Sequence, residues 1–202
     1  SGWNLISSPV VSQDPRRSSI FPGSASMAFI FQGSYIQTDT ILNGYGYWLK
    51  FDEPFMKRFE GIPALNETVT VQTGWNMIGG GSSDVPVSSI RSEPDGIILS
   101  NFYGFDGSYN RADILMPGQG YWVKVSGEGK IYFDGPQQLK AKISPAMIPI
   151  QNKTELIFKD ALGREQRLEL FADSAGRTEV FSLPPVPPEG VFDVRFRSQM
   201  WG

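Results

Sequence analysis

The chain has 202 residues, a formal net charge of -3 at pH 7, and neither histidine nor cysteine. The absence of cysteine excludes disulfides and thiolate chemistry, and the absence of histidine removes the commonest general base and metal ligand. No block of basic residues offers the face that a nucleic acid needs, so we expect no nucleic-acid partner. No apolar run approaches the roughly 20 residues that cross a bilayer, so we expect no membrane span.

A frame of the form Gly-x-Gly-Tyr-Trp-apolar-Lys occurs twice, at residues 44–50 and 118–124. The matches continue outside the frame at a shift of 74 residues, and near each start residues 2–6 match residues 74–78. The shift changes only in stretches rich in Gly, Pro and Ser, where loops absorb differences in length. The sequence therefore predicts an internal duplication.

Short strands are expected in chain order where apolar or aromatic residues run between turn formers. The expected strands cover residues 3–7, 27–31, 35–38, 47–50, 69–72 and 130–133, with residues 55–59 as a candidate counterpart of the last. Asp106-Gly107 between aromatic runs predicts a tight hairpin, because both residues tolerate positive φ. Residues 86–91 indicate a short helical turn.

Each repeated frame places two aromatic residues side by side on one strand, Tyr47 with Trp48 in the first copy. We expect one of the two to face a core and the other a partly covered surface. Gly46 and Gly120 precede these strands, where packing or a bulge is expected to exclude a side chain.

The character of the chain changes after residue 146. Residues 156–159 and 167–171 predict a hairpin around a turn at residues 160–164, and residues 184–188 predict an extended polyproline-type segment. Strict alternation over residues 191–197 predicts a further strand.

The predicted fold class is therefore all-β. Two tandem, pseudo-equivalent units of sandwich-like or barrel-like form are expected over residues 1–72 and 73–146. A smaller antiparallel β segment with the proline-rich stretch follows over residues 147–202. Because the chain opens almost directly on a strand motif, we expect it to be part of a longer protein.

Two segments resemble known repeats, Gly-Trp-Asn-Leu-Ile-Ser at residues 2–7 and Pro-Gly-Gln-Gly-Tyr-Trp-Val-Lys at residues 117–124. They are similar to β-rich repeats of large secreted and cell-surface proteins of the Bacteroidetes/Chlorobi type. Residues 183–196 resemble the segment before the C-terminal sorting domain in proteins exported by type IX secretion. The resemblance implies an accessory region with an extracellular or cell-surface location, and it implies no particular activity.

The aromatic residues are the first candidates for a site. The repeated Trp3, Trp48, Trp75 and Trp122 are expected in a core, since Trp is large and highly buried on average. Tyr35 and Tyr109, beside hairpin turns, are candidates for rings that face a ligand, although burial is the plainer interpretation. Tyr103 is the third candidate of this kind.

No polar motif predicts catalysis or metal binding. Asp106 and Asp113 do not match the spaced acidic pattern of a calcium loop. The carboxylates that glycoside hydrolysis would need come only from turn-like contexts, at Asp52, Glu53, Glu128 and Asp134. We expect no catalytic residue, no metal and no cofactor.

The expected function is that of a non-catalytic structural or adhesive accessory module of a secreted or surface-attached bacterial protein. The first alternative is a carbohydrate-binding module. The second is a non-catalytic part of a secreted polysaccharide-degrading or proteolytic enzyme. Expected partners are neighbouring domains of the parent chain, with a polysaccharide or another surface protein as further candidates.

Overall fold

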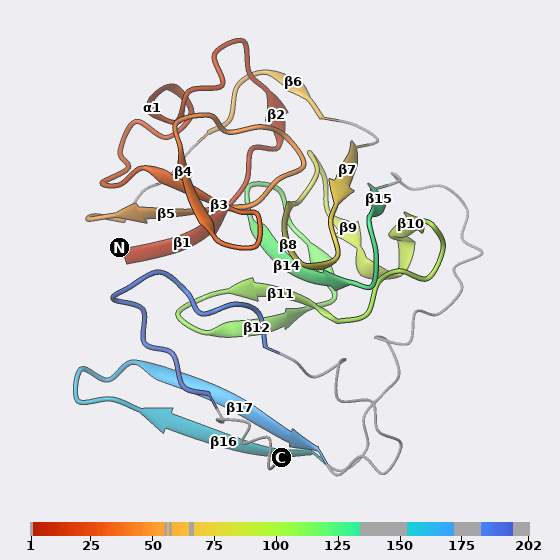
Figure 1. Cartoon of the computed structure of the whole chain (residues 1–202). Helices are drawn as coiled ribbons and strands as arrows, with labels where there is room; N and C mark the ends of the chain where they lie inside the picture. Colours follow the sequence, from red (N-terminus) through yellow and green to blue (C-terminus); the bar gives the residue numbers. More distant parts are fainter. Residues whose placement is uncertain are drawn as a thin grey trace.

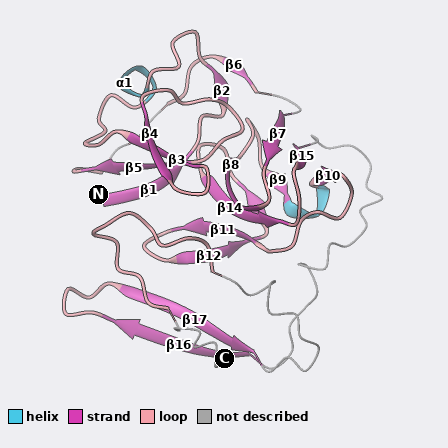
Figure 2. Ribbon diagram, viewed as in Figure 1, coloured by secondary structure: helices cyan, strands magenta, loops and turns pink. Residues whose placement is uncertain are grey.

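The computed structural model describes residues 2–54, 56, 58–64, 67–133, 153–171 and 183–195. The described regular structure is β apart from helix α1 (Arg17–Ile20) and the 3-10 turn η1 (Val87–Ser89) (Figures 1 and 2). The first strands are β1 (Gly2–Ile6), β2 (Val10–Val11), β3 (Ala28–Phe31), β4 (Tyr35–Thr38), β5 (Tyr47–Phe51), β6 (Ile62–Pro63) and β7 (Glu67–Val71). The later strands are β8 (Gly74–Gly79), β9 (Val85–Pro86), β10 (Arg91–Glu93), β11 (Phe102–Phe105), β12 (Tyr109–Ala112), β13 (Ile114–Leu115), β14 (Gly120–Val125), β15 (Gly129–Phe133), β16 (Lys153–Lys159) and β17 (Glu165–Phe171).

Two four-stranded antiparallel sheets repeat one strand order, β1-β5-β3-β4 in the first copy and β8-β14-β11-β12 in the second. Trp3 and Trp75 lie on β1 and β8, and Trp48 and Trp122 lie on β5 and β14. The four repeated tryptophans therefore occupy equivalent strands. The sheets are open, and no described strand closes either of them into a barrel.

The hairpins β3–β4 and β11–β12 turn at equivalent glycines. Gly33 has φ 78° and Gly107 has φ 75°, a left-handed conformation that glycine adopts without steric cost. The Asp106-Gly107 signal for a tight hairpin is thereby confirmed, and Gly33 performs the same turn in the first copy.

Adjacent aromatics of the repeated frame are buried on opposite faces of their strands. Tyr47 lies in a core of the first repeat and Tyr121 in a core of the second. Trp48 and Trp122 both lie in a third core that the repeats share. All four are at most 2% exposed, so the expected partly covered surface is wrong. Successive side chains of a strand point to opposite faces, and each sheet is therefore covered on both sides.

The tyrosine hydroxyls of the frame make the same contact in both copies. The Tyr47 hydroxyl accepts a hydrogen bond from the Leu42 amide at 3.0 Å, and the Tyr121 hydroxyl accepts one from the Met116 amide at 2.7 Å. Each bond satisfies a backbone N–H in the turn before the strand. This contact explains why the first aromatic of the frame is a tyrosine, since phenylalanine has no acceptor.

The two repeats are also joined through their backbones. Strand β7, which ends the first predicted range, pairs with β15 in the sheet β10-β15-β7. The Ser7 amide donates to the Gly118 carbonyl at 3.0 Å, and the Gly79 amide donates to the Gly44 carbonyl at 2.8 Å. The hydrogen-bonded strands thus run across the predicted boundary between residues 72 and 73.

Close backbone approach excludes a side chain at the second glycine of each frame. A Cβ on Gly46 would lie 2.7 Å from the Ile78 carbonyl oxygen, and one on Gly120 would lie 2.8 Å from the Ile6 carbonyl oxygen. Each glycine therefore lets one repeat approach the other. Of the two explanations that the sequence offers, packing or a bulge, packing accounts for both glycines.

The remaining segments differ in how well they follow the sequence pattern. The helical turn near residue 87 and the hairpin β16–β17 are confirmed. No strand forms at the described residues of the 55–59 segment, and residues 191–195 form none either. The backbone groups of Val194 bind the Gln166 side chain of the hairpin instead of a neighbouring strand. Residues 196–197 lie outside the described part of the chain.

Candidate functional site

An aromatic layer lies between the two four-stranded sheets, and we call it the aromatic seam. Its buried members are Leu5, Trp48, Met77, Tyr109 and Trp122, and its partly buried members are Trp3, Phe29, Phe31, Tyr35, Trp75, Tyr103 and Phe105. Both repeats contribute equivalent positions to the seam. It contains every aromatic residue that the sequence singles out as a site candidate.

The closest ring contacts of the seam cross between the repeats. Phe31 of the first repeat lies 5.0 Å from Trp122 of the second, between ring centroids, and Trp48 of the first lies 4.7 Å from Phe105 of the second. Both contacts are T-shaped, an arrangement that aromatic quadrupoles favour. The two contacts are the same interaction with the repeats exchanged.

The three candidate tyrosines all have ring partners in the seam. Tyr109 is only 7% exposed, so it presents no open ring face to a ligand. Tyr35 is half-buried and lies 6.4 Å from Trp122, and Tyr103 is half-buried and lies 6.1 Å from Trp75. The structure brings Tyr35 and Tyr109 into the same seam from different repeats.

Residues 183–195 run along the edge of the seam, and we call them the strap. In Figure 1 the strap is the blue trace between the sheets and the hairpin β16–β17. The Tyr109 hydroxyl donates to the Pro185 carbonyl at 2.8 Å, and the Tyr35 hydroxyl donates to the Val186 carbonyl at 2.8 Å.

A third donor to the strap comes from β1. The Trp3 indole N–H donates to the Glu189 carbonyl at 3.0 Å. Its counterpart Trp75 makes no such bond among the described residues, so the strap breaks the symmetry between the repeats. We call the surface made by Trp3, Tyr35 and Tyr109 the strap face.

Burial keeps the two tyrosine hydroxyls of the strap face protonated. Loss of solvent raises the pKa of Tyr35 to about 12, and it raises the pKa of Tyr109 further. Both groups therefore remain hydrogen-bond donors at any physiological pH. The backbone carbonyls of the strap are acceptors, so donor and acceptor are matched.

Arg195 fixes the proline-rich part of the strap from its other end. Its guanidinium lies 5.9 Å from the centroid of the Tyr109 ring, and it donates to the carbonyls of Pro184 and Pro185. Asp193 pairs with the same guanidinium and balances its charge. The strap is thereby folded back on itself against the seam.

The other side of the strap binds the hairpin β16–β17. Gln166 is 2% exposed, and its side-chain amide donates to the Val194 carbonyl at 2.9 Å and accepts from the Val194 N–H. Arg164 donates to the Gly190 carbonyl at 3.2 Å and lies 5.5 Å from the centroid of the Phe192 ring. The strap therefore connects the hairpin to the repeats.

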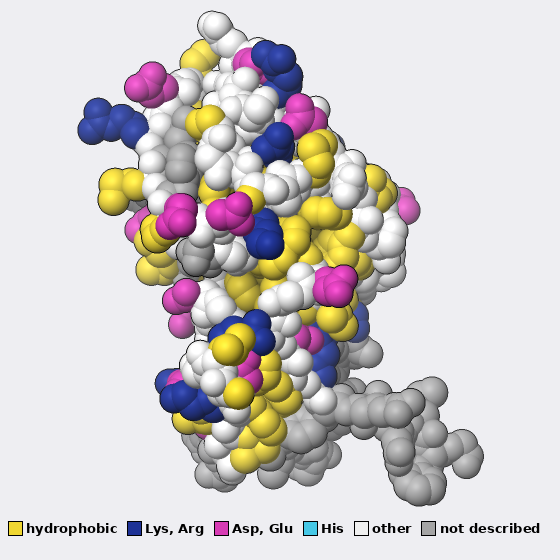
Figure 3. All heavy atoms as spheres, turned by 90° about the vertical axis from the view of Figure 1, so that its left-hand side faces the viewer, with side chains coloured by type: hydrophobic (Ala, Val, Ile, Leu, Met, Phe, Trp, Pro, Cys, Tyr) yellow, Lys and Arg dark blue, Asp and Glu magenta, His cyan; other side chains and the backbone are white. Residues whose placement is uncertain are grey.

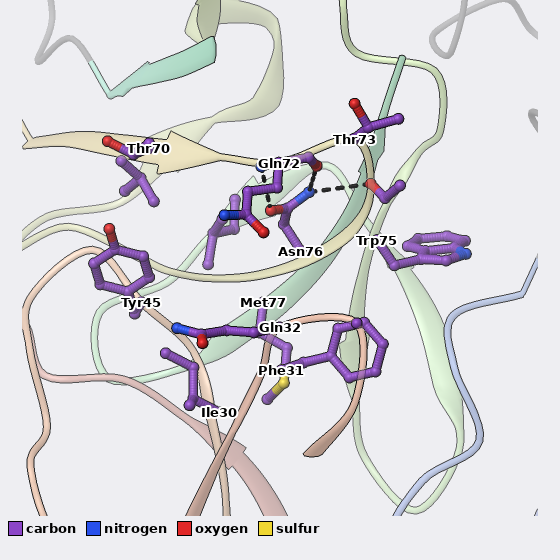
Figure 4. Close-up of a pocket in the computed structure, with 14 residues that line it drawn as sticks. Ile30, Phe31, Gln32, Tyr45, Thr70, Gln72, Thr73, Trp75, Asn76 and Met77 are labelled. Carbon is purple, nitrogen blue, oxygen red and sulfur yellow. Dashed lines mark hydrogen bonds between the residues drawn. The ribbon is translucent and has the colours of Figure 1, made fainter. Parts of the chain in front are cut away.

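A separate open cavity of about 430 Å³ lies between the β3–β4 turn and the β7–β8 turn. Figure 4 shows the amides of Gln32 and Gln72 and the ring of Tyr45 around this hollow. Asn76 holds the β7–β8 turn, because it accepts from the Gln72 N–H at 2.9 Å and donates to the Gly74 carbonyl at 3.0 Å. Gln32 and Gln72 are exposed, and their side-chain amides make no hydrogen bond among the described residues.

The acidic candidates do not converge. Asp52, Glu53 and Glu128 are exposed, and Asp134 lies outside the described residues. Asp113 is exposed and pairs with Arg111 at 3.2 Å. Within the described ranges, no three His, Cys, Asp or Glu residues lie close enough to hold a metal ion.

The surface has no field of a single charge sign on the face that Figure 3 shows. Acidic and basic side chains are interspersed there among uncharged ones. In the part of the chain that the structure describes, no helix has the length and apolar character needed to cross a membrane.

No protein-family model, no curated protein and no solved structure matches this chain.

Proposed function

We propose that the chain is a non-catalytic structural module of a secreted or surface-attached bacterial protein, placed outside the cell or on its surface. Its role is to hold neighbouring domains of a longer chain in a fixed arrangement, and adhesion to another surface protein is a related use of it. We also propose that the two repeats are pseudo-equivalent β units that share one core. The hairpin with the strap is then the smaller third unit.

The observation that carries the proposal is the position of the strap. Two tyrosine hydroxyls from different repeats and the Trp3 indole N–H all bind its backbone. Gln166 of the hairpin binds the same segment from the other side. Aromatic and polar groups that would otherwise be available to a ligand are thus used to fasten one part of the chain to another.

The test is to unfold the whole chain in urea while following the tryptophan emission and the exchange of strap amides together. A structural module of this kind should lose the seam and the strap in linked transitions. A Tyr35→Phe, Tyr109→Phe variant should release the strap at lower urea, and a Tyr45→Phe variant should behave like the wild type. Strap protection that is unchanged in the double variant would contradict the proposal.

A carbohydrate-binding module is the second candidate, and the cavity of Figure 4 is the observation that favours it. The half-buried Tyr45 ring and the side-chain amides of Gln32 and Gln72 line this cavity, and sugars bind to aromatic faces and side-chain amides. A glycan array with the wild-type chain tests this function. Binding that is lost in Gln32→Ala, Gln72→Ala and kept in Gln37→Ala, at an exposed position of β4, would support it.

A further inference from the structure

The strap has the sequence and the burial pattern of a polyproline ligand. Residues 183–190 read Leu-Pro-Pro-Val-Pro-Pro-Glu-Gly, and prolines at this density favour the polyproline II helix, which has three residues per turn. Pro184 and Pro187, three residues apart, are the buried members, and Val186 between them is 59% exposed. One face of such a helix is therefore turned toward the protein.

The hydrogen bonding also matches this class of ligand. A polyproline II helix has no internal hydrogen bonds, so its carbonyls are free to accept. The strap face presents two hydroxyls and one indole N–H, which are donors on large apolar rings. They meet the carbonyls of Pro185, Val186 and Glu189 at 2.8, 2.8 and 3.0 Å. Aromatic surfaces that recognise proline-rich peptides use this combination of ring contact and hydrogen bonding.

The contact does not depend on the strap belonging to the same chain. The described strap forms no helix or strand, and its bonds to the strap face are side chain to backbone. The same three donors can therefore bind the carbonyls of an identical segment from another molecule.

We propose that the strap face is a binding site for a proline-rich segment, and that its occupant in trans is segment 183–195 of a second copy of this chain. The second copy carries the matching sequence, and exchange of an identical element is a low-cost route to a dimer. Binding in cis has the advantage of a high effective concentration, so exchange is favoured where copies are crowded or the cis contact is weakened. The proposal adds a partner and does not depend on the structural role proposed above.

The first experiment measures binding of a fluorescent peptide of sequence 183–195 to the full chain. In a strap variant with Pro184→Ser, Pro187→Ser and Arg195→Ser the strap face is vacated, and saturable binding is expected. In the wild-type chain the strap already fills the face in cis, so the peptide should bind at least about tenfold more weakly. Adding Tyr35→Phe and Tyr109→Phe to the strap variant should weaken binding by about tenfold or more, because two donors are removed.

Two controls keep the result specific. A peptide with the same three substitutions should not bind, and Tyr45→Phe in the strap variant should leave binding unchanged. Circular dichroism and tryptophan emission confirm that each variant is folded, and the single variant Arg195→Ser replaces the triple variant where that one fails to fold. A folded, vacated chain that shows no saturable binding overturns the proposal, as does equal binding with and without the two tyrosine hydroxyls.

The second experiment tests the second copy as the occupant. The strap variant is mixed with a face variant, Trp3→Phe, Tyr35→Phe, Tyr109→Phe, which keeps an aromatic ring at each position and loses the three donors. The face variant has an intact strap to donate and the strap variant has an intact face to receive it. Light scattering should show a one-to-one complex in the mixture and monomers for each variant alone. Peptide binding without a complex in the mixture would exclude the second copy as the occupant.

Discussion

Phe31 and Trp122 belong to different repeats, and their rings meet edge to face with centroids 5.0 Å apart. The reciprocal contact joins Trp48 to Phe105 at 4.7 Å. Each repeat thus supplies one tryptophan and one hairpin phenylalanine to the other. Removal of either repeat would expose the apolar seam of its partner, so we infer that the repeats fold as one cooperative body.

The first prediction concerns the two seam tryptophans. Trp48→Ala and Trp122→Ala each leave a large cavity in place of a side chain that is 0% exposed, and each should cost about 3–5 kcal/mol of unfolding free energy. Urea unfolding measures the cost. Because the contacts are reciprocal, the two variants should lose similar amounts and should each destabilise both repeats.

The control for the tryptophan variants is Met56→Ala, at a side chain that is 97% exposed, which should unfold within about 0.5 kcal/mol of the wild type. Tyr109→Ala should resemble the tryptophan variants, because Tyr109 is buried and its hydroxyl holds the strap. A Trp122→Ala chain that melts like the wild type would show that the seam is not a core.

The second prediction concerns the glycines of close approach. Gly46→Ala and Gly120→Ala each place a methyl group against a backbone carbonyl oxygen of the other repeat, at 2.7 and 2.8 Å. The repeats must move apart, and we expect a loss of about 1–3 kcal/mol in each variant. Gly127→Ala is the matched control, since its Cβ would meet nothing within 4 Å. Equal stability of all three variants would disprove the steric explanation.

Much of the fold follows from local sequence. The duplication places equivalent strands by direct comparison, and Asp106-Gly107 marks its hairpin because few residues tolerate positive φ. Burial of Trp48 and Trp122 follows from the size of the side chain. Each of these features depends on a short stretch of chain, so the local sequence pattern predicts it.

The strap contact is different, because it depends on residues far apart in the chain. Strict alternation over residues 191–197 favours a strand, yet a strand needs a neighbour, and the Val194 backbone groups bind the Gln166 side chain instead. The positions of Tyr35 and Tyr109 beside hairpin turns favour ligand-facing roles for both residues. The strap carbonyls bind the hydroxyls of both tyrosines, and only the three-residue spacing of Pro184 and Pro187 hints at this contact in the sequence.

The third prediction concerns Gln166, the buried polar residue between hairpin and strap. Gln166→Ala leaves the Val194 N–H and carbonyl without their partner, and the lost pairing should cost about 1–3 kcal/mol locally. Hydrogen exchange at the Val194 amide should accelerate by about tenfold or more, while amides of the seam strands should change little. Gln37→Ala, at an exposed position of β4, is the control. Unchanged exchange at Val194 would show that Gln166 does not hold the strap.

The last prediction is a loss of stability at alkaline pH. Burial raises the pKa of Tyr35 from 10.0 to about 12 and raises the pKa of Tyr109 as well. Between pH 10 and 12 the unfolded chain therefore binds fewer protons than the folded chain, so the unfolding free energy falls as the pH rises. Stability from these groups is fully present below pH 10. It is lost as the pH rises through 12, where the Tyr35 phenolate can no longer donate to Val186.

Urea titrations between pH 8 and 12 check this sign. Tyr35→Phe, Tyr109→Phe has two fewer groups to deprotonate, so its stability should fall less steeply above pH 10 than that of the wild type. The unfolding free energy of the double variant should still fall somewhat with pH, because burial also raises the pKa of Tyr47 and of Tyr121. The control variant Gln37→Ala, at an exposed position of β4, should retain the wild-type slope. If the double variant and the wild type lose stability in parallel, the two hydroxyls do not titrate under the strap, and the hydrogen bonds to Pro185 and Val186 are not the ones that hold it.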